Sequence, residues 1–207
     1  MCTQTGVIET LLMCGANINH RDKHGWTALM AGIAENNPAA PMRTLLRHGV
    51  DTGVRALGGM FYGKDNGTVD LHFLTNDTAL TLAVRCDGRD MVGALLQAGV
   101  DPDQRAEVDG IANVTALMIA IKNGNIDLFC MLLRHGANVA LEDAKGQTAL
   151  DYAEQYMTQQ LDLETTTDET EAATMSRADE NWQLVHAAIL HRISLELRPL
   201  KRARIRR

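Results

Sequence analysis

"GWTALMAG", residues 25–32, contains a Thr-Ala-Leu step that returns three more times along the chain. The other copies are "NDTALTLA" at 76–83, "NVTALMIA" at 113–120 and "GQTALDYA" at 146–153. Successive threonines are separated by 51, 37 and 33 residues. A period of roughly 20–50 residues is typical of repeat architectures, so we interpret the chain as a repeat protein before considering any single site.

A second motif, Leu-Leu-x-x-Gly, follows the same rhythm. It occurs at 11–15, 45–49, 95–99 and 132–136. In the last three copies its first leucine follows the repeat's threonine by 18, 17 and 17 residues. The spacing inside a repeat is therefore almost constant, and the extra length lies between repeats, where insertions fall in loops.

Each repeated position has a structural reason. A threonine hydroxyl can cap the first helix of a pair, and alanine is a strong helix former. The Leu-Leu pair suits the buried stripe of a second helix, and the following glycine suits its C-terminal end. Thr148 and Asp151 have the spacing of a capping box. Two positions before each threonine the chain has a residue that tolerates a left-handed backbone, which predicts a tight turn: Gly25, Asn76, Asn113 and Gly146.

These motifs are similar to those of the ankyrin repeat family. The best matches are Asp22-x-x-Gly25-x-Thr27-Ala28-Leu29, Asp143-x-x-Gly146-x-Thr148-Ala149-Leu150 and "LLRHGANV" at 132–139. The resemblance covers roughly residues 6–156. It implies a mainly α solenoid of stacked helix-turn-helix pairs with β-hairpin fingers, made of about four repeats and a partial N-terminal one.

The chain departs from the family's Thr-Pro-Leu-His pattern. Alanine replaces the proline in every copy, and the histidine is replaced by Met30, Thr81, Met118 or Asp151. The resemblance implies that a Thr–His hydrogen bond inside the turn is missing, so we expect a less rigid stack of the same fold.

The repeat pattern divides the chain into segments. They are 1–20 (a partial repeat with its second helix only), 21–53 (repeat 1), 54–76 (an extended finger insertion), 77–103 (repeat 2), 104–140 (repeat 3), 141–197 (repeat 4, with an acidic Thr-rich insertion at 161–180) and 198–207 (a basic tail). The partial repeat leaves an apolar edge, so either residues are missing upstream or something covers this edge. The insertion is expected to be solvated and disordered, with threonine phosphorylation as an open alternative. A helix near 180–197 is expected to close the stack, with Trp182 packing in it.

The finger insertion carries half of the chain's phenylalanine and tyrosine residues. Phe61, Tyr62 and Phe73 lie in it, beside an Asn66-Gly67 step that favours a hairpin. Aromatic side chains on a projecting loop are candidate anchors for a partner. The alternative is that the finger folds back and covers the groove with the same rings.

Composition limits the functional classes. No apolar run is long enough for a membrane span, and the N-terminus lacks a secretion signal, so we expect an intracellular, cytoplasmic protein. The four cysteines are irregularly spaced and are expected to be reduced thiols. The chain carries a net charge of −6 although its last ten residues contain no acid. The acidic body argues against nucleic acid as the main ligand.

The basic tail has three interpretations. It can be held by an acidic nuclear-import receptor, it can contact phosphates of nucleic acid or membrane, or it can be a solvated end that balances the acidic body. The residues concerned are Lys201, Arg202, Arg204, Arg206 and Arg207.

No pattern predicts chemistry. The sequence lacks a nucleophile elbow, a phosphate loop, a zinc-protease motif and a kinase signature, so we expect no enzyme activity and no cofactor. Cys14, His20 and His24 could suggest a metal, but Cys14 precedes a helix-capping glycine and His24 occupies a variable turn position. We therefore expect no metal site.

The resemblance implies protein–protein recognition by a chain that is itself a monomer. By family position, a partner is expected to contact the turn tips, the concave face and the finger. The corresponding residues are Lys23, His24, Trp26, Glu35, Phe61, Tyr62, Phe73, Asp77, Arg85, Val114, Lys122, Asn123, Lys145, Gln147, Gln155 and Tyr156. Trp26 is the leading candidate, with packing against the neighbouring turn as its alternative role. Two other functions stay open: a fragment or regulatory arm of a larger enzyme or signalling protein, and a nuclear regulator imported through its tail.

Overall fold

The computed structural model describes residues 4–23, 25–35, 37, 39–55, 61–62, 69–70 and 76–164. Within them the chain forms two columns of helices and two short antiparallel strand pairs. The inner column is α2 (Ala28–Ala34), α4 (Ala79–Arg85), α6 (Ala116–Lys122) and α8 (Ala149–Glu164). The outer column is α1 (Gln4–Met13), α3 (Ala39–Arg47), α5 (Arg89–Gln97) and α7 (Ile126–Arg134). The strands are β1 (Phe61–Tyr62), β2 (Val69–Asp70), β3 (Arg105–Val108) and β4 (Ile111–Thr115).

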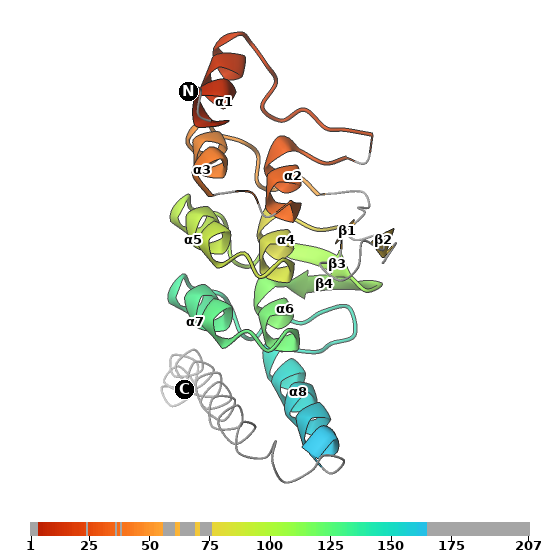
Figure 1. Cartoon of the computed structure of the whole chain (residues 1–207). Helices are drawn as coiled ribbons and strands as arrows, with labels where there is room; N and C mark the ends of the chain where they lie inside the picture. The colour runs from red at the N-terminus through yellow and green to blue at the C-terminus, as the bar shows by residue number, and fades with distance from the viewer. Residues whose placement is uncertain are drawn as a thin grey trace, which may run out of the picture.

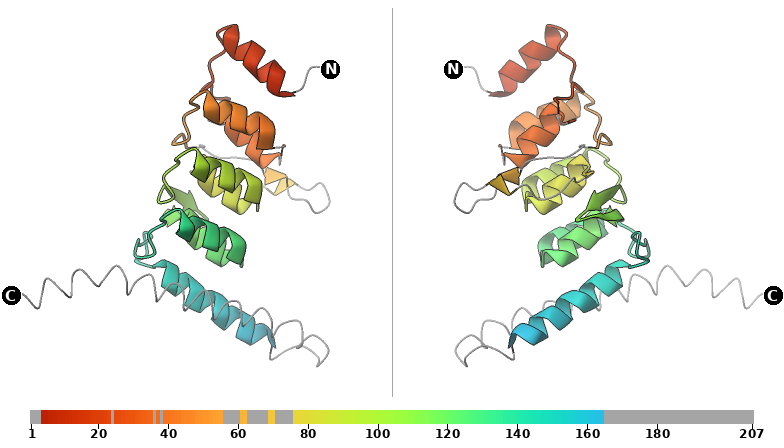
Figure 2. Two further views of the ribbon diagram at one scale, coloured as in Figure 1. Left: turned by 90° about the vertical axis from the view of Figure 1, so that its left-hand side faces the viewer. Right: turned by 90° about the vertical axis from the view of Figure 1, so that its right-hand side faces the viewer.

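The two columns run side by side along one axis (Figure 1). Each inner helix packs on the next inner helix, and each outer helix packs on the next outer helix. The side views show the pairs as successive layers (Figure 2). This arrangement confirms the predicted solenoid of stacked helix pairs. It also puts α1, on its own, in the outer column against α3.

One continuous apolar core joins the layers. The leucine of the Thr-Ala-Leu step is fully buried in the first three repeats, at Leu29, Leu80 and Leu117. Buried leucines of the second motif face them from the outer column, and the buried cluster extends from Leu29 to Ala153. Because every layer shares this core with its neighbours, the helices are stabilised by stacking rather than by their own short length.

The predicted threonine caps are present in three repeats. The hydroxyls of Thr27, Thr78 and Thr115 accept a hydrogen bond from the backbone N–H three residues later, at 3.4, 3.3 and 3.4 Å. These bonds satisfy first-turn N–H groups that a helix leaves without an internal partner.

The fourth repeat begins differently. Both the backbone N–H and the hydroxyl of Thr148 donate to Oδ2 of Asp151, at 2.6 and 2.7 Å. Asp151 therefore reaches back to the N-cap as the capping-box spacing predicted, but the threonine hydroxyl is a donor here. The two hydrogen bonds lower the pKa of the Asp151 carboxyl.

In the second, third and fourth repeats, other side chains bond the N-cap N–H in place of the Thr–His bond that the resemblance implied to be missing. Thr81 Oγ1 accepts the N–H of Thr78 at 2.9 Å, and Met118 Sδ accepts the N–H of Thr115 at 3.5 Å. Together with Asp151, three different residue types thus replace the histidine of the family pattern.

Three of the four predicted left-handed positions are confirmed. Gly25, Asn113 and Gly146 have φ of +78°, +64° and +75°. At the fourth position, the N–H of Asn76 donates to the carbonyl of Glu107 at 3.2 Å in the next repeat.

A hairpin that the sequence did not lead us to predict precedes α6. β3 and β4 pair antiparallel around Asp109 and Gly110, whose φ values of +52° and +75° are those of a tight two-residue hairpin turn. The register shift between Ala106 and Val108 leaves β4 with one extra residue, which explains the left-handed backbone of Asn113 as part of a bulge.

Several predicted features lie partly or wholly outside the described residues. Within 54–76, β1 and β2 form an antiparallel pair, with Phe61 opposite Asp70 and Tyr62 opposite Val69. His24, Phe73, the helix near 180–197 and the tail at 198–207 lie outside the described residues. Helix α8 continues to Glu164 and so overlaps the first four residues, 161–164, of the predicted insertion. None of the described helices is long and apolar enough to cross a membrane.

Candidate recognition surface

The turn tips and the β3–β4 hairpin project from the inner column on the side away from the outer column (Figure 1). We call this row the finger row and define it by residues 21–26, 105–114 and 143–147. The chain enters α2, α6 and α8 from this row, so the main chain of the row is held at the N-terminus of each of these helices. Side chains that point out of the row are free of the core and can contact a partner.

An aspartate side chain accepts main-chain hydrogen bonds in each of the first and fourth tips. Asp22 Oδ1 accepts the N–H of Trp26 at 2.8 Å. Asp143 Oδ1 accepts the N–H groups of Lys145 and Gln147 at 2.8 and 2.9 Å. These bonds explain why Asp-x-x-Gly is kept at both tips, since each carboxylate closes its own turn.

The predicted contact residues of these tips stay at or near the surface. Lys23 and Lys145 are exposed, whereas Trp26 and Gln147 are half-buried. Trp26 packs against the core cluster, so part of its ring is used inside the molecule and part remains accessible.

A side chain of the following helix also holds the fourth tip in place. The hydroxyl of Tyr152 on α8 donates to Asp143 Oδ2 at 2.9 Å. Burial raises the pKa of Tyr152 well above its usual range, and the carboxylates of Asp143 and Asp109 add to this shift because they repel a phenolate. Tyr152 is therefore a neutral donor that holds the tip against its helix.

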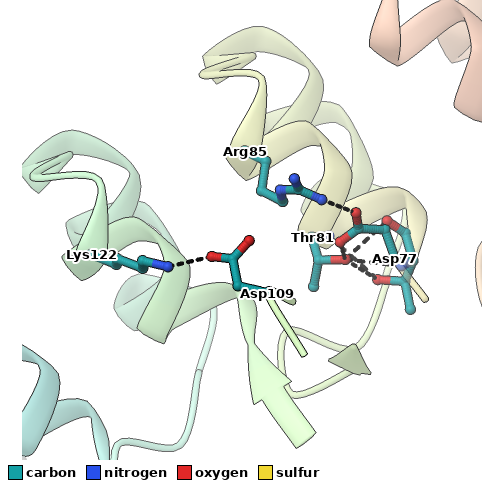
Figure 3. Close-up of polar contacts among 6 residues, drawn as sticks. Asp77, Thr81, Arg85, Asp109 and Lys122 are labelled. Atoms are coloured by element: carbon teal, nitrogen blue, oxygen red, sulfur yellow. Dashed lines mark hydrogen bonds and ion pairs between the residues drawn. The ribbon is translucent and has the colours of Figure 1, made fainter. Parts of the chain in front are cut away.

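Two predicted contact residues of the second repeat are less exposed than we predicted. Asp77 is 1% exposed; its Oδ1 accepts the hydroxyl of Thr81 at 3.0 Å and its Oδ2 forms an ion pair with Arg85 (Figure 3). The Arg85 side chain is itself 19% exposed. Asp77 is therefore buried rather than at the surface as predicted, and Arg85 is only partly exposed.

The third repeat gives a mixed result. Val114 is buried beneath the hairpin, so its predicted exposure is wrong: the bulge turns this side chain into the core. Lys122 and Asn123 are exposed at the end of α6, and Lys122 forms an ion pair with Asp109 of the hairpin turn (Figure 3).

The hairpin adds surface residues that sequence reasoning missed. Asp109, Ala112 and Asn113 are exposed on it. The signal was an Asp-Gly step between apolar residues that alternate with polar ones, which is a strong local sign of a hairpin.

Main-chain hydrogen bonds connect consecutive fingers. The N–H of Asn76 donates to Glu107 in β3, and the N–H of Ala144 donates to Ala112 in β4 at 2.9 Å. The hairpin is therefore held on both edges, and the second, third and fourth repeats present one continuous edge.

Three further predicted residues lie on inner helices: Glu35 at the C-terminal end of α2, and Gln155 and Tyr156 in the middle of α8. Glu35 and Gln155 are exposed, and Glu35 accepts a bond from Asn37 at 3.0 Å. Tyr156 is half-buried against Gly124, where an added Cβ would lie 2.6 Å from the phenol oxygen. The side chains of Phe61 and Tyr62 are outside the described residues, as are His24, Phe73 and the basic tail.

No cluster for metal binding is present among the residues that the structure describes. Cys14 and His20 are both exposed.

A stack of helix pairs with a finger row on one side defines a solenoid of the protein-binding class. Residues 1–106 match a family model described as ankyrin repeats (3 copies), and residues 110–153 match a model described as ankyrin repeats (many copies). The chain belongs to the ankyrin-repeat family. Members of this family are in general non-enzymatic modules for protein–protein interaction.

The relatives are longer proteins. The chain is 30% identical over 141 residues to the phosphocholine transferase AnkX of Legionella pneumophila, covering 65% of this chain and 14% of that protein. It is 29% identical over 151 residues to the nuclear factor NF-kappa-B p105 subunit of Gallus gallus (72% and 14%), and 28% identical over 153 residues to the B-cell lymphoma 3 protein homolog of Mus musculus (73% and 30%). The chain thus spans less than a third of each relative.

Proposed function

We propose that this chain binds a protein partner along the finger row and the adjoining ends of the inner helices. The observation that carries the proposal is the fixed main chain of the row. Asp22 and Asp143 close the tips, and bonds from Asn76 and Ala144 hold the hairpin on both edges. A surface that is ordered before binding loses little conformational entropy when a partner docks.

The proposed contact residues are those that the fold leaves outside the core. Lys23, Trp26, Lys145 and Gln147 belong to the tips, and Asn113 joins them from the hairpin. Glu35, Lys122, Asn123, Gln155 and Tyr156 would extend the surface along the inner helices. Phe61, Tyr62, Phe73 and His24 remain proposed contacts from the sequence.

Trp26 is the proposed anchor. Its backbone is held by Asp22 and part of its ring is accessible, so it presents a rigid aromatic surface without a large loss of side-chain freedom. The two exposed lysines at the first and fourth tips suit acidic groups on the partner.

Site-specific photo-crosslinking tests this surface. A photoreactive residue is placed at Trp26, Asn113 or Lys145, and in matched controls at the exposed Arg43 and Arg134 of the outer column. The expected result is one common protein crosslinked from the three finger-row positions and absent from the two controls. Crosslinks of equal yield from both sets would contradict the proposed surface.

A second candidate function is that of an ankyrin arm within a larger enzyme or signalling protein. It is favoured by the short share of each relative that the chain covers, 14% for AnkX and for the p105 subunit. Determining the coding sequence on both sides of this segment tests it: a continuous reading frame into a further domain supports the arm.

The third candidate, a nuclear regulator imported through its tail, rests on the basic residues of 198–207 and on the name of one relative, a nuclear factor. Deletion of 198–207 is expected to abolish nuclear accumulation. Accumulation that persists after the deletion would remove the basis of this candidate.

A further inference from the structure

Two neighbouring contacts between layers of the stack differ in the polar links that cross them. The layers concerned are α2 with α3, α4 with α5, and α6 with α7 (Figure 2). We call the contact between the first two layers the first junction, and the contact between the last two layers the second junction. Apolar packing crosses both, because each inner helix packs on the next inner helix and each outer helix packs on the next outer helix.

Two side-chain links cross the second junction where the outer helices begin. Arg89, the first residue of α5, forms an ion pair with Asp127, the second residue of α7, at 2.7 Å. The side-chain amide of Asn125, the N-cap of α7, donates to the carboxylate of Asp87 just before α5. The start of α7 is therefore held to the start of α5 by two directed contacts.

A third link crosses the second junction between the loops that follow the outer helices. Oδ1 of Asp103, after α5, accepts the backbone N–H of Asn138, after α7, at 2.8 Å. The equivalent link also joins α1 to α3, where Oδ1 of Asn19 accepts the N–H of Asp51 at 2.8 Å. This kind of link is thus present on either side of the first junction.

The first junction lacks the cation of the ion pair. Ala39 is the first residue of α3 and stands in the place of Arg89. Asp90, the second residue of α5, stands in the place of Asp127 and keeps the carboxylate. Because alanine has no charge, this ion pair cannot form at the first junction.

Glycines remove the other two links from the first junction. Gly88 is the N-cap of α5 and stands in the place of Asn125. Gly53 stands in the place of Asp103 in the loop after the outer helix. Neither glycine has a side chain, so residue identity alone excludes all three links at these positions.

The covalent connection across the first junction is also the longer one. Residues 48–78 connect α3 to α4, which is 31 residues, whereas residues 98–115 connect α5 to α6, which is 18. Each residue adds roughly 3.3 Å to the reach of a chain. The longer connection therefore limits the movement of one layer relative to the next less strictly.

We propose that the first junction is a hinge, about which α1, α2 and α3 turn as one unit relative to the unit of α4 to α8. Apolar contacts are non-directional, so α2 and α3 can rotate by small angles on α4 and α5 while the core stays closed. Hydrogen bonds and ion pairs depend on both distance and angle, so the three links of the second junction resist the same rotation.

The hinge is independent of the proposed partner site, but it sets the spacing within the finger row. Trp26 belongs to the unit that turns, whereas Ala112 and Lys145 belong to the other unit. Each tip keeps its own hydrogen bonds during the rotation. The separation between the first tip and the later ones therefore varies in the free protein.

Double electron–electron resonance on the full chain tests the hinge with two equivalent pairs of spin labels. The pair at Arg47 and Ala112 spans both junctions. The pair at Gln97 and Lys145 occupies the same positions one layer later and omits the first junction. All four positions are exposed, and a ketone-bearing unnatural amino acid carries each label so that the native cysteines stay in place. The distance distribution of the first pair is expected to be the broader one, and equal widths would overturn the proposal.

Restoring the missing links tests their role in the hinge. Ala39→Arg together with Gly53→Asn supplies a cation for Asp90 and an acceptor in the loop. This variant is expected to narrow the distribution of the pair at 47 and 112 to about that of the pair at 97 and 145. Ala39→Gln together with Gly53→Ala is the matched control, which changes the same positions without a charge or a loop acceptor and is expected to keep the broad distribution. Circular dichroism should show the same helix content in all labelled chains. Equal narrowing in both variants, or none in either, would overturn the proposal that the missing links make the hinge.

Discussion

Three acidic residues before successive inner helices are each bound by a side chain from the helix that follows. Asp77 pairs with Arg85 of α4, Asp109 with Lys122 of α6, and Asp143 accepts from Tyr152 of α8. The three contacts have the same purpose, which is to hold the entry segment against its helix. They differ in burial, and burial determines how much free energy each one contributes.

The two ion pairs should respond very differently to loss of the cation. Arg85→Ala leaves the Asp77 carboxylate buried without its counter-charge, so we expect a loss of about 3–5 kcal/mol in the free energy of unfolding. Lys122→Ala breaks a pair whose side chains are 49 and 46% exposed. Its expected loss is about 0–1 kcal/mol. Urea unfolding of both variants checks the contrast, and equal losses would contradict it.

Tyr152 should make stability depend on alkaline pH. Its pKa in the folded state is raised above the usual value of about 10, so the unfolded chain loses this proton at a lower pH than the folded one. The contribution is complete below about pH 10 and is lost as the pH rises beyond it. Tyr152→Phe should cost about 1–3 kcal/mol at pH 8 by leaving Oδ2 of Asp143 without its hydrogen-bond donor.

The measurement for Tyr152 is urea unfolding of wild type and Tyr152→Phe at pH 8 and at pH 11. The wild type is expected to lose more stability between the two values than the variant does. A variant with the same pH dependence as the wild type would show that Tyr152 does not cause it.

At the scale of elements, the loops after the outer helices form an incomplete ladder. In each loop one side chain accepts a hydrogen bond from the backbone N–H two residues further along the chain. The accepting side chains are Asn17, Asp51, Asp101 and Asn138. That later residue then connects to the next loop: Asn19 Oδ1 accepts the N–H of Asp51, and Asp103 Oδ1 accepts the N–H of Asn138, both at 2.8 Å. The residue that would connect the second loop to the third is Gly53, which has no side chain.

Gly53→Asn should complete this ladder and stabilise the protein. The backbone of Gly53 is not left-handed, and a Cβ there meets Asp51 at 3.4 Å, which is an ordinary contact. Gly53→Ala is the matched control and should add about 0.4–1 kcal/mol by restricting the unfolded chain. The asparagine should add about 0.5–1.5 kcal/mol more through a bond from the N–H of Asp101. Thermal unfolding that ranks asparagine at or below alanine would contradict the missing connection.

At the scale of the whole molecule, the stack was predictable and the surface was only partly so. Thr-Ala-Leu and Leu-Leu-x-x-Gly determine the helix pairs because capping and apolar spacing act within a few residues. Asp77 and Val114 were predicted at the surface from family position, which takes no account of an arginine eight residues away that pairs with Asp77, or of a bulge in the strand that carries Val114. Such placements depend on contacts between segments, and one sequence does not show them.

The stacked arrangement also predicts which helices a destabilising core substitution affects. Leu29 and Leu117 occupy the same position in their repeats and are both fully buried, so alanine at either should cost about 2–5 kcal/mol locally. In a linear array each layer depends on its neighbours alone. Leu29→Ala should therefore speed amide hydrogen exchange in α1, α2 and α3 and leave α6 and α7 nearly unchanged. Leu117→Ala should speed exchange from α4 through α8, because α6 packs on α4, α7 and α8. Hydrogen exchange read by mass spectrometry resolves these helices, and uniform acceleration in both variants would show that the chain unfolds as one unit.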